Sequence, residues 1–80
     1  MSKRKVTGDI EVRGVFRDAN MLAIREQVTL EQAPYTVDHM SKQFAGLRFI
    51  EVRYPGGEKD VFDPAGVFMF GLPAMNSRKE

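Results

Sequence analysis

The spacing of apolar residues changes twice along this chain, and that change most constrains its fold. In DIEVRGVFR, residues 9–17, apolar and polar side chains alternate, which is the period of a half-buried strand. Within residues 36–46 apolar residues recur instead at the spacing of one helix face. Alternation returns in LRFIEVRY, residues 47–54. We therefore predict strands around a single helix, with Gly14 as a candidate bulge in the first strand.

The helix is expected over about residues 36–45. Ala33-Pro34 interrupts the chain before it, and Thr36 has the type of side chain that caps a helix N-terminus. Gly46 stands where a glycine commonly ends a helix. The buried stripe is predicted to consist of Val37, Met40 and Phe44.

Residues 21–30, MLAIREQVTL, fit two descriptions. Their composition favours a helix, but apolar residues also share one strand face that only Glu26 interrupts. The short polar turn RDAN, residues 17–20, and the Val-Thr-Leu ending favour a strand that returns beside the first one. We predict a strand here, with a helix as the alternative.

The last third of the chain predicts further strands separated by turns. Residues 55–57, Pro-Gly-Gly, are a strong turn signal after the strand of residues 47–54. Asp63-Pro64 interrupts the returning strand, because proline lacks the backbone donor that a sheet needs. The predicted fold is α+β, with strands and helix in ββαββ order and the helix on one face of a small antiparallel sheet.

Eighty residues are enough for one small domain, here residues 1–80. The absence of cysteine excludes disulfides, and one histidine argues against structural zinc. We expect flexible basic ends at residues 1–5 and 76–80. Five basic residues and one acidic residue there sum to +4, and the seven basic and ten acidic residues of the body sum to −3.

Neither end of the chain predicts a membrane anchor. A membrane-spanning helix needs roughly 20 apolar residues, and no segment of this sequence approaches that length. The basic start is followed by Thr7, Asp9 and Glu11, where a secretory signal needs an uninterrupted apolar run. We therefore expect a soluble, cytoplasmic protein that does not act on a membrane.

No group of residues predicts catalysis or a cofactor. His39 is the single imidazole, and neighbouring helix residues such as Asp38 point about 100° away from it. PGGEKD, residues 55–60, lacks the Lys-Ser/Thr pair of a phosphate-binding loop. The acidic residues near that turn match no cation-binding loop. We expect a protein that is not an enzyme and that binds neither metal nor cofactor.

One face of the predicted sheet carries arginines. Glu11 and Glu51 are expected on the same face, so a ladder of ion pairs is the favoured interpretation. The alternatives are an arginine patch that contacts a partner and a weak platform for single-stranded nucleic acid. The residues in question are Arg13, Arg25, Arg53 and Phe49.

The stretch VFDPAGVFMFGLPAM, residues 61–75, holds more apolar residues than one strand face can bury. Regular alternation places Phe68 and Phe70 on one side, where we expect them to complete the core. Val67, Met69 and Leu72 are then predicted to border a surface that binds a partner, because apolar residues are enriched at interface centres.

These features predict a non-catalytic protein–protein interaction module. It would be a small regulator or inhibitor of a larger complex, of the type that mobile elements carry, and the apolar C-terminal edge would bind a protein partner or a second copy. One alternative is a weak RNA- or single-stranded-DNA-binding domain that uses the arginine face and the basic ends. Another is a small oligomeric component of a virion.

Overall fold

The structure is a computed structural model that describes residues 8–73. The predicted α+β class, with one helix on an antiparallel sheet, is confirmed, and the last predicted strand is divided in two at Asp63-Pro64. The basic ends, residues 1–5 and 76–80, lie outside the described residues. The elements are β1 (Ile10–Phe16), β2 (Ile24–Val28), α1 (Ala33–Gln43), β3 (Leu47–Arg53), β4 (Lys59–Phe62) and β5 (Phe68–Leu72).

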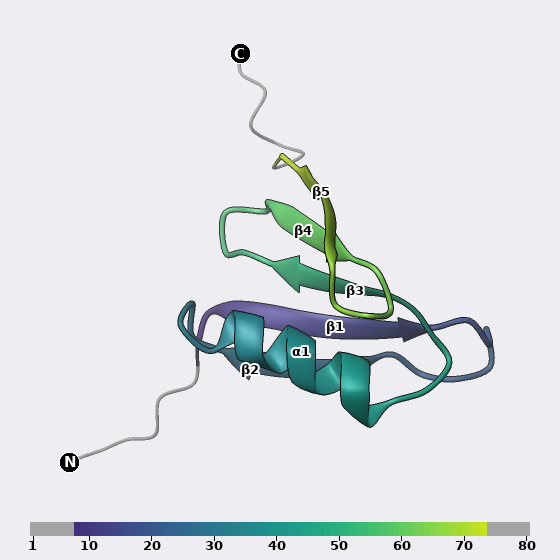
Figure 1. The fold of residues 1–80 in the computed structure, drawn as a ribbon. Helices are drawn as coiled ribbons and strands as arrows, with labels where there is room; N and C mark the ends of the chain where they lie inside the picture. The colour runs from purple at the N-terminus through teal and green to yellow at the C-terminus, as the bar shows by residue number, and fades with distance from the viewer. Residues whose placement is uncertain (1–7, 74–80) are drawn as a thin grey trace.

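The five strands form one sheet in the order β2-β1-β3-β4-β5, and every neighbouring pair is antiparallel (Figure 1). β1 and β2 form a hairpin, and α1 then carries the chain across β1 to β3 on its other side. β3, β4 and β5 follow one another as a meander. This connectivity places β5 at one edge of the sheet and β2 at the other.

The strand interpretation of residues 21–30 is confirmed in β2, and the helix alternative is wrong. The turn before it is held by Asp18, whose side chain accepts a hydrogen bond from the Asn20 amide and whose carbonyl accepts one from Met21, at 2.9 and 3.0 Å. Glu26, which interrupted the apolar pattern, lies opposite Val12 of β1 and is exposed. A carboxylate on an edge strand stays hydrated, so it does not prevent the strand from forming.

The helix begins three residues earlier than the sequence pattern predicted, and Thr36 is not its cap. Thr29 and Gln32 instead form a reciprocal pair: Gln32 N donates to Thr29 Oγ1 at 3.3 Å, and Thr29 N donates to Gln32 Oε1 at 3.1 Å. A capping box has the same reciprocal pattern. Here the pair closes the turn of residues 29–32 that leads into the helix, and the N-cap residue of α1 is Gln32, whose side chain does not cap it. Pro34 lies in the first turn, where its missing amide hydrogen costs nothing.

The helix ends at Gln43, two residues before the position expected. The Phe44 amide donates to Met40 O at 3.1 Å, while the backbone of Phe44 is already extended. Gly46 has φ +82°, so it makes the left-handed turn, but two residues beyond the helix cap rather than directly after it. The helix itself is confirmed.

Helix α1 packs on β1 and β3, and the core lies between them. Val12, Met40 and Ile50 are fully buried at its centre. Gly14 is not the bulge that we expected, because the register shifts between Val15 and Phe16. A Cβ on Gly14 would lie 3.2 Å from the Leu47 side chain and 3.4 Å from Met40 Sδ, so this glycine lets α1 and β3 pack closely on β1.

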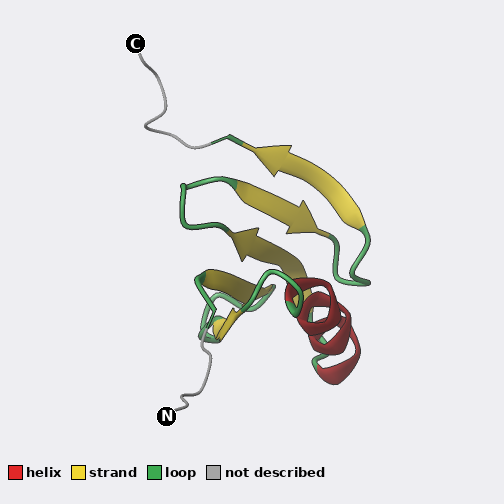
Figure 2. Ribbon diagram, turned by 90° about the vertical axis from the view of Figure 1, so that its left-hand side faces the viewer, coloured by secondary structure: helices red, strands yellow, loops and turns green. Residues whose placement is uncertain are grey.

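Helix α1 covers only part of the sheet. Figures 1 and 2 show the helix beside β1, while β4 and β5 extend away from it. The meander therefore reaches beyond the helix-covered core. Its outer strand is β5.

Candidate partner-binding edge

The carboxylate of Asp63 stabilises the turn between β4 and β5 by accepting backbone hydrogen bonds. Asp63 Oδ1 accepts hydrogen bonds from the amides of Ala65 and Val67, both at 2.9 Å. The Asp63 amide in turn donates to Val67 O, and Gly66 adopts φ +86°. A Cβ on Gly66 would lie 3.3 Å from Ser41 Oγ, so the turn rests against α1. The turn thus fixes where β5 begins.

A bulge in β5 separates its two phenylalanines. Phe68 pairs with Phe62, and Phe70 pairs with Val61, so the register skips Met69. Phe62 and Val61 are neighbours on β4 and point to opposite faces of the sheet. Phe68 is therefore on the helix side, where its ring meets the Phe62 ring edge-on at 5.7 Å, and Phe70 is on the open side.

The expectation that Phe68 and Phe70 together complete the core is therefore wrong. They lie on opposite faces, and 55% of Phe68 and 46% of Phe70 remain exposed. Regular alternation cannot reveal this, because a bulge has no reliable signature in one sequence. The two phenylalanines join Val67, Met69 and Leu72 at the surface, where all five are exposed. That Val67, Met69 and Leu72 border a partner surface stays a prediction.

Exposed apolar residues gather at this strand. Among the described residues nine large apolar side chains are exposed, and five of them lie between Val67 and Leu72. Scattered exposed apolar residues are ordinary, whereas contiguous ones mark interaction surfaces. We call this group the β5 patch; it consists of Val67, Phe68, Met69, Phe70 and Leu72.

The two edges of the sheet differ in charge. β2 exposes Arg25 and Glu26, and charged residues on an edge strand discourage pairing with another chain. β5 consists of Phe-Met-Phe-Gly-Leu and carries no charge. Within residues 8–73 no strand pairs with its outer edge. Of the two unpaired edges in residues 8–73, β5 is therefore the one without a charge that opposes strand pairing.

The predicted ladder of ion pairs is present on the open face of the sheet. Glu11 lies between two arginines, with Arg25 Nε at 3.9 Å and Arg53 Nη1 at 3.6 Å from its carboxylate oxygens. Glu51 lies between Arg13 Nη1 at 3.8 Å and Lys59 Nζ at 3.9 Å. These distances are too long for hydrogen bonds, so the attraction is through space. Lys59 was not among the residues that the sequence pattern placed on this face.

Phe49 is the aromatic residue predicted for the same face. It pairs with Val15 of β1 and is half-buried. Arg13 is also partly covered, and its Nε has no hydrogen-bond partner among the described residues. The arginines thus lie beside carboxylates, and the ring predicted for this face is only partly available for stacking. Phe70 of β5 adds a second, more exposed ring on the same face.

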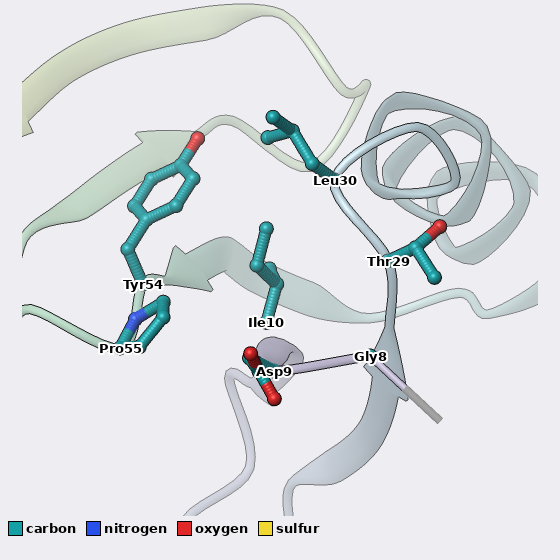
Figure 3. Close-up of a pocket in the computed structure, with 7 residues that line it drawn as sticks. All are labelled: Gly8, Asp9, Ile10, Thr29, Leu30, Tyr54 and Pro55. Carbon is teal, nitrogen blue, oxygen red and sulfur yellow. The ribbon is translucent and has the colours of Figure 1, made fainter. Parts of the chain in front are cut away.

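A hollow of about 480 Å³ lies where β1 begins and β2 and β3 end (Figure 3). Its walls include Ile10, Leu30, Tyr54 and Pro55, and the Asp9 carboxylate stands at its edge. The Thr29 and Tyr54 side chains supply the hydroxyl groups of its lining.

Tyr54 beside this hollow has a perturbed hydroxyl. It donates a hydrogen bond to Asp60 Oδ2 at 2.7 Å. Burial, and after it the hydrogen bond to Asp60, raises the pKa of Tyr54 to about 12. The phenol therefore stays protonated near neutral pH and acts as a donor that fixes β3 to β4.

His39 is exposed on α1 and lines a hollow with Glu26, Tyr35 and Thr36. Asp38 lies 3.2 Å from Lys42 Nζ instead, and Ser41 Oγ donates to the Asp38 carbonyl. In the described part of the chain no three potential metal-ligating side chains come together. The one helix there is too short to cross a bilayer.

Comparisons with protein-family models, with curated proteins and with solved structures find no match for this chain.

Proposed function

We propose that this protein is a non-catalytic interaction module that binds a protein partner through the β5 patch. The observation that carries the proposal is the gathering of five exposed apolar residues on an uncharged edge strand. Apolar side chains on both faces of such a strand, beside its free backbone groups, are the features that strand-pairing partners use. The protein would act by binding its partner and not by catalysing a reaction, as a regulator of a larger complex does.

The open face offers less to a nucleic acid. Phosphate contacts need cations whose charge is available, and each of Arg13, Arg25 and Arg53 lies within 3.9 Å of a glutamate. Displacing those carboxylates would reduce any gain from phosphate binding. This arrangement favours a protein partner over RNA or single-stranded DNA.

The proposal is tested by capture from a nuclease-treated lysate at low and high salt. The sharp variant is Met69→Asp, and its matched control is Met21→Asp, because the two methionines are 54% and 52% exposed. We expect Met69→Asp to abolish capture and Met21→Asp to leave it unchanged. Binding should largely survive high salt, because an apolar interface does not depend on counterion release.

Two outcomes would contradict the proposal. Equal capture by both variants would show that the β5 patch does not bind the partner. Capture that disappears with nuclease or falls steeply with salt would indicate the nucleic-acid alternative. Circular dichroism of each variant shows that a loss of capture is not a loss of fold.

A further inference from the structure

We infer that the partner at the β5 patch is a second copy of this chain, joined by antiparallel pairing of β5 with β5 into one continuous sheet. The inference rests on the proposed function and adds the identity of the partner.

The absence of charge makes β5 complementary to itself. In a two-fold dimer the same surface meets itself, so a charged patch would face its own sign. From Ala65 to Pro73 the chain carries no charged residue. β2, at the other edge, exposes Arg25 and Glu26 and lacks this property. A second copy is thus a partner that β5 can accept without any charge being buried.

The faces of the strand favour edge pairing over stacking of two sheets. Phe68 lies on the helix side with Phe62, while Phe70 lies on the open side with Val61. A partner stacked on either face would cover one phenylalanine and leave the other exposed. A strand added at the edge places side chains beside both faces and also pairs the free backbone groups.

The exposed area indicates a weak dimer. With about half of the roughly 200 Å² of a phenylalanine as an upper value for each of its five residues, the β5 patch exposes at most about 500 Å² per copy. Two copies would then bury at most about 1,000 Å², which does not exceed the lower limit for a specific interface. The bulge at Met69 and Pro73 after the strand also shorten the regular pairing. We therefore expect a dissociation constant of micromolar order or weaker.

Sedimentation velocity of the full chain across a range of concentrations tests the association. The variant is Leu72→Asp and the control is Leu30→Asp, the same substitution at an exposed leucine outside β5. We expect the natural chain and Leu30→Asp to dimerise alike. Leu72→Asp should raise the dissociation constant at least about tenfold, because it buries an unpaired charge.

Distances between spin labels test the geometry. The chain has no cysteine, so a single introduced cysteine carries the label. A continuous ten-stranded sheet separates the two β2 strands by nine spacings of about 4.8 Å, or about 43 Å before twist. Labels on Leu72→Cys should lie within about 20 Å of each other, since five-residue strands span about 17 Å. Labels on Gln27→Cys of β2 should lie far apart.

The outcomes separate this inference from the proposed function. A chain that stays monomeric at high concentration, yet captures another protein in a Met69-dependent way, would contradict the β5 dimer. The proposed function as a protein-binding module would still stand. Dimers that Leu72→Asp does not weaken, or Gln27 labels closer together than Leu72 labels, overturn β5 pairing. A monomer that also captures nothing overturns both.

Discussion

Tyr54 is the residue whose ionisation the fold changes most clearly. Its hydroxyl connects the end of β3 to β4 by donating a hydrogen bond to Asp60. The backbone amide of Tyr54 donates a second hydrogen bond, to Glu58 O at 2.9 Å, across the turn between these strands. Its ring packs against the core cluster. Ionising this phenol would replace a hydrogen bond with repulsion between two anions in a partly buried place.

We expect Tyr54 to titrate well above an ordinary tyrosine. The chain has two tyrosines, so Tyr35→Phe leaves Tyr54 as the single phenol. Its pKa is raised from 10.0 to about 12, and the ultraviolet absorbance of tyrosinate should show a midpoint near that pH. A midpoint near pH 10 in a chain that circular dichroism shows to be folded would contradict the hydrogen bond.

The same shift predicts how stability changes at alkaline pH. Because the folded pKa lies above the unfolded one, the stabilisation from protonated Tyr54 is complete below pH 10 and is lost as pH rises toward 12. Denaturant unfolding of the natural chain and of Tyr54→Phe at several pH values measures this loss of stabilisation. The difference between their unfolding free energies should narrow across that interval.

At the scale of elements, the strands and the helix followed from apolar periodicity, but their ends did not. The predicted start of α1 is three residues late because the turn of residues 29–32, closed by Thr29 and Gln32, lies within a stretch that reads as a strand ending. Thr-x-x-Gln signals a helix start nearby but places it before Ala33. The bulge in β5 had no such signal, since it depends on which residues of β4 lie opposite, and this led to the wrong placement of Phe68 and Phe70.

Two glycines in turns, Gly46 and Gly66, allow the cost of adding a Cβ to be compared with and without a neighbouring side chain. Gly46 and Gly66 both have positive φ, at +82° and +86°, but only Gly66 has neighbours near the position of an added Cβ. Gly46→Ala should cost about 1–2 kcal/mol of unfolding free energy, the usual penalty of that backbone conformation. Gly66→Ala should cost more, because the new methyl group would meet Ser41.

Urea unfolding of the two variants measures this difference. An additional double variant, Gly66→Ala with Ser41→Gly, removes the neighbour and should recover part of the extra loss. Equal destabilisation by Gly46→Ala and Gly66→Ala would mean that the β4–β5 turn does not rest on α1.

At the scale of the whole molecule, stability is expected to be uneven. The fully buried residues belong to β1, β3 and α1, whereas every residue of β5 is exposed and its one strand neighbour among the described residues is β4. Elements with few buried contacts open locally at lower free energy than the core. We therefore expect β1, β3 and α1 to open at a higher free energy than β5.

Amide hydrogen exchange followed by nuclear magnetic resonance should reveal this gradient. In dilute samples we expect the slowest exchange at Val12, Ile50 and Val52, and fast exchange along β5. Raising the protein concentration should slow exchange in β5 while leaving β2 unchanged. Uniform protection across the sheet would contradict the gradient, and concentration-independent exchange in β5 would contradict the dimer.

The unlike edges of the sheet set a limit on how large an assembly can become. If both edges accepted strands, copies could add head to tail and grow into an open filament. Here only β5 is uncharged, and Arg25 and Glu26 mark the opposite boundary. In the proposed dimer, joining two molecules through β5 would leave only the charged β2 edges of residues 8–73 unpaired. On that proposal, assembly would stop at two copies.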